Sequence, residues 1–421
     1  MRPQKILLSI ALFILALMLI PSFLNAQGIK VADGLTIDGQ IRERTEFDGK
    51  DFNTDTDMIE RSYLRTRLGL KFTRIENTQI YLQFQDSRNL GTNSGGLTND
   101  DNLGIHQAYI KFMIPGMEGS WLQLGRFEAK YGRERVIGAV GWSNIGRTFD
   151  GLRFGYDGGF LSFDLFLLKI VERGFGTPSR AGDHHLYGLY TRWLERHLHI
   201  FGLLDYDHQE SFPGSDEPTL ARYTLGTYYH RTTRSGFDVA LDLAYQGGEY
   251  DRINVDKIAA YMLAAELGYT FVNSDARPRI GAGVDMTSGD EGIDASELNT
   301  YDNLYYTGHA YRGYMDLFVE NPFEGLFDLF GRVSIMPTDK WWFGFDFHYF
   351  RTMEDYFILT EPIGDNTSSA IGSEIDFTAK YNIYENLDAQ GGLSLFFPSE
   401  DWQGDDSDTG TWFYFMLTAG L

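Results

Sequence analysis

The chain has 421 residues, contains no cysteine and carries a formal net charge of −23. This acidity excludes nucleic acid as an expected partner, because nucleic-acid-binding chains present excess positive charge, and without cysteine the fold cannot depend on disulfides. Aromatic residues make up 15% of the chain and glycine contributes 47 residues. That composition is typical of a β-barrel with one face in lipid and the other in water, although a soluble sandwich or propeller shares it.

The N-terminus predicts a secretory signal peptide. Arg2 and Lys5 precede an apolar run at residues 6–20, and a small residue, Ala26, offers a cleavage point. The run is shorter than the ~20 apolar residues that a spanning helix needs, so an uncleaved anchor is the weaker alternative. We therefore expect a cleaved signal peptide at 1–26 and one exported domain over the remaining residues, 27–421.

From residue 35 onward, the chain repeats short runs in which apolar and polar residues alternate, as in half-buried β-strands. The clearest runs are residues 63–72, 80–85, 237–246, 261–271, 341–349 and 374–381. Eighteen such runs predict an all-β fold, a transmembrane antiparallel up-and-down β-barrel of about 18 strands. Two runs, 148–156 and 186–191, alternate less regularly, so 16 strands stay an alternative.

The connections between these runs alternate between short and long. The short ones are residues 74–77, 115–120, 157–159, 194–196, 232–236, 273–278, 337–340 and 382–386. The long ones are residues 48–59, 86–103, 132–147, 172–184, 207–219, 248–257, 288–324, 352–370 and 398–410. Outer-membrane barrels have short periplasmic turns and longer outer loops. The alternation therefore predicts an even strand number, with both termini on the short-turn side.

Residues 412–421 predict the strand that closes the barrel. Every second residue there is apolar, namely Phe413, Phe415, Leu417, Ala419 and Leu421. A closing strand leaves no unpaired edge in lipid. The pattern also resembles the C-terminal signal read by the outer-membrane assembly machinery, which we expect as a partner.

Strand parity divides the charged residues between two sides of a water-filled lumen. The early strands place basic residues on the inner face, namely Arg42, Arg44, Arg65, Arg67, Lys71, Lys111 and Arg153. The later strands place acidic residues there, namely Asp238, Asp242, Glu266, Asp285, Asp328, Asp346, Glu374 and Asp376. Opposed walls of this kind focus a transverse field across the lumen. Alternatively, these charges only solvate the interior and pair across strands.

The connection at 132–147 belongs to a basic segment between two strand-like runs, and we expect this segment to narrow the lumen. Its charged residues are Lys130, Arg133, Arg135 and Arg147 against Glu134 and Asp150. The sequence leaves open whether 132–147 itself folds inward. Arg126 shares parity with the apolar Leu122 and Leu124, so only a bulge or an inward turn at Gly125 would bring it into the lumen.

No spacing of Ser, His, Asp or Glu forms a nucleophile or metal motif, so we expect neither an enzyme nor a cofactor or metal. The acidic run at 401–408 could hold calcium, but it lacks a fixed ligand spacing, and a solvated loop is the simpler interpretation.

Several motifs resemble the alginate-export family of outer-membrane porins. They are Leu124-Gly125-Arg126, Tyr131-Gly132, Glu134-Arg135, Ile137-Gly138, Trp142 and Arg147-Thr148-Phe149-Asp150-Gly151. The resemblance implies a monomeric 18-stranded porin of the bacterial outer membrane, in contact with lipid and lipopolysaccharide. It further implies a basic constriction that passes an anionic polysaccharide, formed by Arg44, Arg65, Arg67, Arg126, Arg147 and Arg153. Gating by a long periplasmic plug is not expected, because every predicted periplasmic turn is short.

Three functions are compatible with this sequence. The first is a passive channel for anionic polysaccharide or small anionic solutes, with weak binding to lumen Arg and Lys. The second is a general diffusion porin with little selectivity. The third is a barrel whose long loops bind surface ligands, with a tyrosine cluster in residues 288–324 (Tyr301, Tyr305, Tyr306, Tyr311 and Tyr314) as the binding surface.

Overall fold

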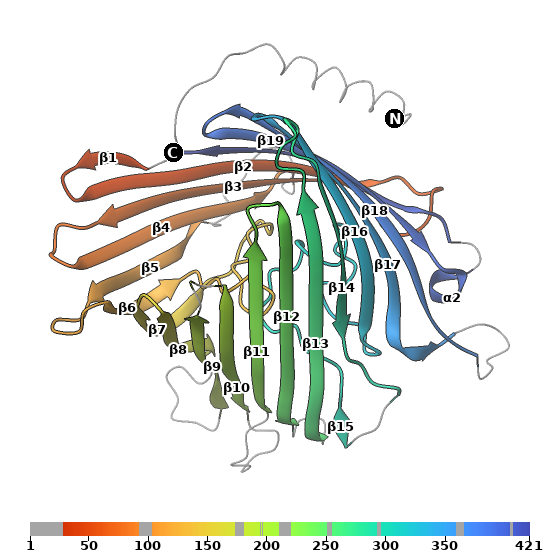
Figure 1. Cartoon of the computed structure of the whole chain (residues 1–421), viewed down its shortest axis with the longest axis horizontal. Coiled ribbons are helices and arrows are strands. Elements are labelled where there is room, and N and C mark those ends of the chain that lie inside the picture. The colour runs from red at the N-terminus through yellow and green to blue at the C-terminus, as the bar shows by residue number, and fades with distance from the viewer. Residues whose placement is uncertain are drawn as a thin grey trace.

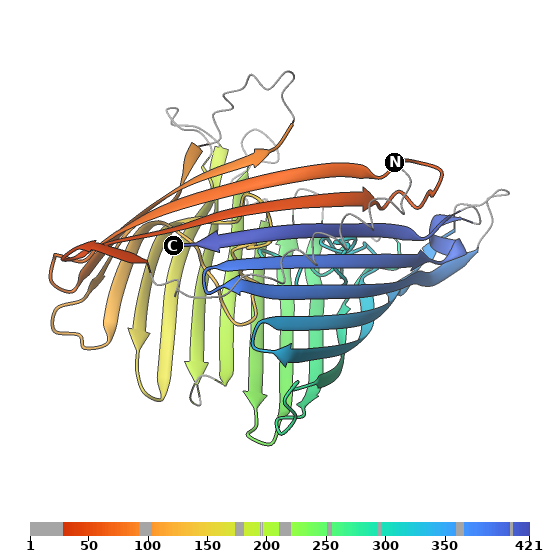
Figure 2. The ribbon, with the colours of Figure 1, turned by 90° about the horizontal axis from the view of Figure 1, so that it is seen from above.

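The chain folds into a closed antiparallel barrel of 18 strands, and the alternative of 16 strands is wrong. The computed structural model describes residues 28–91, 103–172, 181–193, 195, 197–209, 220–250, 255–292, 296–358, 366–404 and 407–421. The predicted signal peptide, 1–26, lies outside these residues. The wall closes where β2 (Leu35–Gly49) pairs with β20 (Gly410–Gly420), from Gln40 opposite Gly420 to Gly49 opposite Thr411. Figures 1 and 2 show these first and last barrel strands side by side.

Each barrel strand between β2 and β20 pairs with its neighbours in chain order, apart from the short β15. These strands are β3 (Ile59–Phe72), β4 (Thr78–Asn89), β5 (Leu103–Met113), β6 (Ser120–Phe127), β7 (Phe149–Asp157), β8 (Leu161–Val171), β9 (Ala181–Trp193), β10 (Leu198–Gln209), β11 (Leu220–Thr232), β12 (Phe237–Tyr250), β13 (Val255–Thr270), β14 (Arg279–Thr287), β16 (Leu326–Thr338), β17 (Trp341–Phe357), β18 (Thr367–Tyr384) and β19 (Leu387–Pro398). Three small elements complete the fold, namely β1 (Ile29–Ala32), β15 (Glu297–Leu298) and α2 (Glu400–Gln403). None of the helices in the described ranges is long and apolar enough to cross a membrane.

The predicted alternation of faces is confirmed along the wall. Leu68 on β3 and Leu267 on β13 are exposed on the outside, whereas their sequence neighbours Arg67 and Glu266 point inward to partners inside the barrel. Strand geometry sends successive side chains to opposite faces, so one register fixes the apolar belt for lipid and the polar row for the interior. Strand lengths are unequal, from 8 residues in β6 to 18 in β18.

Two segments fold into the barrel, as Figure 1 shows inside the ring of strands. We name residues 128–148, between β6 and β7, the first inward segment. Residues 299–325, between β15 and β16, are the second inward segment. They join through a parallel bridge between Ile137 and Tyr305, in which Gly138 N donates to Tyr305 O at 2.8 Å. Together they form a partition across the lumen.

The inner face is not polar throughout, because the middle strands also place apolar residues there. Phe166 and Leu168 on β8 and Leu203 on β10 point inward and are almost fully buried. They belong to one apolar cluster with Tyr131 and Ile137 of the first inward segment. Burying this apolar surface stabilises the inward position of the segment.

Candidate functional site

The inner wall of β2–β4 holds the first inward segment through its main chain. Arg42 and Arg65 lie directly opposite each other on β2 and β3, and both are 4% exposed. Arg42 donates to the carbonyl oxygens of Gly141 (2.8 Å) and Ser143 (2.9 Å). Arg65 donates to the same two oxygens at 3.0 and 2.8 Å. Among the described carboxylates, none lies within 4.0 Å of either guanidinium.

Three further donors from this wall reach the neighbouring carbonyls. They are Arg44 Nη1 to Trp142 O (2.6 Å), Ser87 Oγ to Asn144 O (2.8 Å) and Gln85 Nε2 to Ile145 O (2.6 Å). We name residues 140–146 the finger. A hydrogen bond from Arg147 N to Ala139 O (2.7 Å) closes its base, and both end residues, Val140 and Gly146, have positive φ, at 50° and 78°.

Arg67 has a different partner from its neighbours. It donates to Glu128 Oε1 at 3.1 Å, and Glu128 also receives His106 Nε2 (2.9 Å) and Lys130 Nζ (3.0 Å). Burial alone would raise the pKa of Glu128, but these three groups outweigh it and hold that pKa at about 2. Glu128 thus anchors the start of the first inward segment as a carboxylate.

The remaining predicted basic residues are dispersed along the inner wall. Lys111 lies over the Trp121 ring, 3.7 Å from its centroid, and Arg153 donates to Gln123 Oε1 at 2.7 Å. Lys71, toward the short-turn end of β3, is partly exposed. Arg147 instead joins the two inward segments, because its Nη1 donates to Tyr306 O at 3.0 Å.

Arg126 corrects the prediction from resemblance. It pairs with Asp150 on the outer face of the wall, with Nε and Nη2 at 2.8 and 2.6 Å from the carboxylate oxygens, and its side chain is 44% exposed. Neither a bulge nor an inward turn occurs at Gly125, because the β6–β7 register is continuous there and Phe127 takes the inward position. The position of Arg126 therefore follows the alternation of faces along β6 and not the role that the family motif implies.

The acidic wall holds the inward segments through arginines that the segments supply. Arg133 contacts Asp242 (3.0 Å) and Glu266 (3.3 Å). Arg135 Nη1 lies 2.5 Å from Asp285 Oδ2. Burial would lower the pKa of Arg135, but the adjacent Asp285 reverses the effect and raises it. From the second inward segment, Arg312 also reaches Asp285, at 3.4 Å.

Three of the other predicted acidic residues pair within the wall itself. These pairs are Asp238 with Arg279 (2.6 Å), Asp328 with His348 (2.9 Å) and Asp346 with Arg332 (3.3 Å). Six of the eight predicted acidic residues therefore have a basic partner within 3.5 Å, while Asp376 lies 4.0 Å from His348 and the buried Glu374 accepts from Met315 N at 2.8 Å. The arginines at 42, 65 and 147 have no such partner among the described carboxylates, so Arg42 and Arg65 leave unpaired positive charge on the β2–β3 side of the interior.

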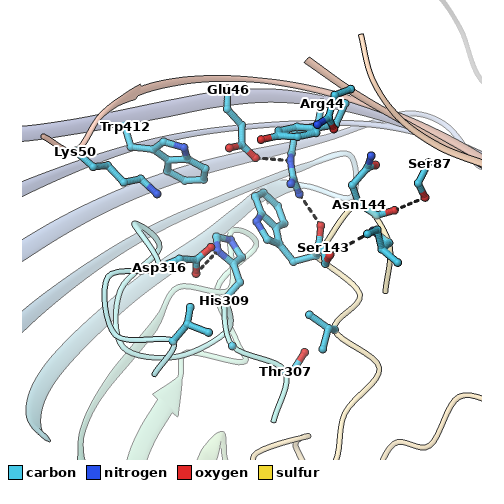
Figure 3. A pocket seen from close by; sticks show the side chains of 17 residues that line it. Arg44, Glu46, Lys50, Ser87, Ser143, Asn144, Thr307, His309, Asp316 and Trp412 are labelled. Atoms are coloured by element: carbon cyan, nitrogen blue, oxygen red, sulfur yellow. Dashed lines mark hydrogen bonds and ion pairs between the residues drawn. The ribbon is translucent and has the colours of Figure 1, made fainter. Parts of the chain in front are cut away.

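A cavity of about 630 Å³ lies on the long-loop side of the partition and is shown in Figure 3. The finger lines one side of it, and the second inward segment contributes His309 and Asp316. The Trp142 ring stacks on the His309 ring at 3.8 Å between centroids, and Arg44 covers the Trp142 ring at 4.0 Å. A second cavity of about 330 Å³, lined by Arg133, Glu266 and other charged residues, lies toward the short turns.

The tyrosines of 288–324 do not form a surface patch. Tyr301 and Tyr306 are buried, and Tyr311 places its ring 3.8 Å from the Arg135 guanidinium. They belong to the partition. In the described part of the chain, no group of three or more His, Asp or Glu is arranged to hold a metal ion.

Sequence reasoning missed the anchoring roles of Arg133, Arg135 and Arg312. The excess of arginine in a glycine-rich connection was a usable signal for the first two. The five finger carbonyls gave no signal, because main-chain oxygens are present at every residue.

The fold matches solved outer-membrane proteins over nearly its full length. OccK11 (OpdR) of Pseudomonas aeruginosa has 14% identity and a TM-score of 0.59, with 95% of this chain and 99% of that chain covered. OpdL of the same organism has 12% identity and a TM-score of 0.61, covering 93% and 99%. OccAB3 of Acinetobacter baumannii has 9% identity and a TM-score of 0.59, covering 93% and 100%. At these identities the likeness shows the fold alone. No curated protein sequence matches the chain.

A closed 18-stranded barrel with an apolar outer belt and loops folded into its lumen defines a channel of the bacterial outer membrane. The sequence signature described as alginate export matches residues 33–411. The chain belongs to the alginate export family.

Proposed function

We propose that this barrel is a passive channel that favours anionic solutes, either an anionic polysaccharide or small carboxylates. The observation that carries the proposal is the unequal pairing of the two walls. Six of the eight predicted carboxylates of the acidic wall have a basic partner within 3.5 Å, whereas Arg42 and Arg65 contact only neutral oxygens. Paired charges largely cancel at a distance, so the unpaired Arg42 and Arg65 make the field on the β2–β3 side of the lumen positive.

The relatives give independent support. The structure of OccK2 (OpdF) of Pseudomonas aeruginosa is a complex with glucuronate, and that of OpdK is a complex with vanillate. Both ligands are carboxylates. Planar carboxylates suit arginine, whose guanidinium offers two parallel N–H donors.

The test is ion selectivity in planar bilayers. Under a KCl gradient, the reversal potential should show chloride permeating faster than potassium, and the double variant Arg42→Gln/Arg65→Gln should reduce that ratio by several-fold, because it removes the unpaired charges. Arg126→Gln is the matched control, since it removes an arginine from the outer face and should leave the ratio unchanged. Equal permeability of both ions in the wild type would contradict the proposal and leave a general diffusion porin.

We further infer the surroundings of the channel. The apolar belt would contact lipid and, in the outer leaflet, lipopolysaccharide, and β20 would present the signal that the assembly machinery reads. Residues 1–26 would be removed on export, and the barrel would work as a monomer. Protease mapping of the mature N-terminus and the mass of the detergent-extracted protein test the last two statements.

A further inference from the structure

The finger binds the barrel wall mainly through its main-chain carbonyl groups, although one bond runs the other way, from Asn144 Nδ2 to Arg88 O at 3.1 Å. Five consecutive carbonyl oxygens, from residues 141–145, accept hydrogen bonds from side chains of β2, β3 and β4. In these bonds the wall supplies only donors and the finger supplies only acceptors. We name the five donors, Arg42, Arg44, Arg65, Gln85 and Ser87, the donor strip; Arg44 also pairs through its Nε with Glu46 Oε1 at 2.6 Å. A strip of this kind fits any extended chain of oxygen acceptors.

We propose that the finger is an internal pseudo-ligand: its carbonyl oxygens occupy the donor strip that binds the carboxylate and hydroxyl oxygens of the anionic solute, and the arriving solute displaces it. This inference rests on the proposed function, because it takes the solute to be an oxygen-rich anion. It adds that the constriction opens in response to the solute rather than standing permanently open.

Charge favours the solute over the finger. Arg42 and Arg65 are directly opposite like charges on neighbouring strands, an arrangement that is destabilising unless something neutralises it. Carbonyl dipoles neutralise two buried guanidinium groups only in part. Hydrogen bonds from arginine to a carboxylate are roughly twice as strong as those to a neutral acceptor and can be bidentate. A carboxylate therefore competes well for the same donors.

The finger can leave without unfolding the rest of the partition. The Ala139–Arg147 hydrogen bond pins its base, and Arg133 and Arg135 hold the body of the segment on the opposite wall. Val140 is β-branched with a φ of 50°, a strained conformation for such a residue. The adjoining 630 Å³ cavity gives the displaced finger room to move.

Displacement would also act on the second inward segment. Trp142 is the finger residue whose ring stacks on His309, and the other face of that ring meets Arg44. When the solute binds Arg44, the Trp142 ring loses its contact with the guanidinium group and keeps only its contact with His309. The Trp142–His309 contact then loosens, and the long-loop side of the partition widens.

The chain has no cysteine, so a single spin label can report on the finger. Ile145→Cys suits the purpose, because the Ile145 side chain is 66% exposed. Ile75→Cys, on the short turn after β3 and 59% exposed, is the matched control. D-glucuronate is the anionic probe and D-glucose, at equal concentration, is its neutral counterpart. We expect glucuronate to raise the mobile fraction at position 145 at least about twofold, in a saturable way, with no change at position 75 or with glucose.

A second variant separates anchoring from charge. Arg42→Lys/Arg65→Lys keeps both positive charges but lacks the planar fork, so the label at 145 should be mobile already without glucuronate while anion preference persists. Gel-shift on heating confirms that each variant is folded. If the label stays immobile both at glucuronate concentrations that reduce chloride current and in the lysine variant, the pseudo-ligand is overturned although the channel remains anion-selective. Loss of anion selectivity in the wild type would instead remove the proposed function itself.

Discussion

The wall formed by β2–β4 and the wall formed by β12–β14 hold the same partition by opposite means. On the first wall, arginines donate hydrogen bonds to main-chain oxygens of the finger. On the second wall, carboxylates form ion pairs with arginines that belong to the inward segments. Only the second arrangement cancels charge. The comparison teaches that the field in this lumen follows from what remains after pairing rather than from the number of charges on each wall.

The most disruptive change should be on the acidic side. Arg135→Ala leaves Asp285, which is 1% exposed, with the weaker contact to Arg312. Removing one member of a buried ion pair typically lowers the free energy of unfolding by about 3–5 kcal/mol, so we expect a loss in that range. Urea unfolding in lipid vesicles measures it. A loss below that of the exposed pair variant Arg126→Ala would show that the acidic wall does not anchor the partition.

An intermediate effect should come from acid acting on Glu128. Its pKa is lowered from 4.5 to about 2 in the folded protein, so the ionised carboxylate stabilises the fold above pH 4.5. That contribution is lost as the pH falls from 4.5 toward 2. The urea midpoint should therefore drop in this window, and Glu128→Gln should flatten the drop.

Glu118→Gln, on an exposed turn after β5, is the control for that measurement and should keep the steep dependence. If Glu128→Gln titrates like the wild type, the anchor at the start of the first inward segment lies elsewhere. In that case the hydrogen bonds of the finger would be the main anchor of the first inward segment on the β2–β4 wall.

The smallest effect should come from the outer face. Arg126→Ala breaks an ion pair whose partners are 44% and 52% exposed, and exposed pairs contribute about 0–1 kcal/mol. Stability and conductance should both stay near wild-type values. A large change in chloride selectivity would mean that the outer pair senses the lumen after all.

Much of the wall was predictable, because strand parity is a local property. The alternation at 63–72 separates Arg65 and Arg67 from Leu68 without knowledge of any distant contact. Loop lengths supplied the even strand number. Parity alone also places Arg126 on the outside. The family resemblance predicted Arg126 in the constriction instead, and that prediction is wrong.

The partition was not predictable in the same way. Phe166 and Leu168 alternate with the equally apolar Leu165 and Leu167, so the pattern on β8 cannot show which face meets lipid and which meets a folded loop. The contact between Arg42 and Gly141 spans 99 residues and depends on a main-chain oxygen. Neither the residue type nor the spacing carries that information.

The unequal strand lengths have a consequence for access. On β17 the continuous run of apolar outward residues stops at Tyr349, and exposed Arg351 and Asp355 follow, with the apolar Phe357 at the strand end. An 18-residue strand such as β18 is roughly 60 Å long, whereas the apolar band of such barrels is about 25 Å tall. The side of the barrel formed by β17 and β18 therefore extends beyond the apolar core of the bilayer, whereas the side that contains β6 ends closer to the membrane surface. We therefore expect solutes to reach the lumen more readily over the lower side of the wall, that of β6.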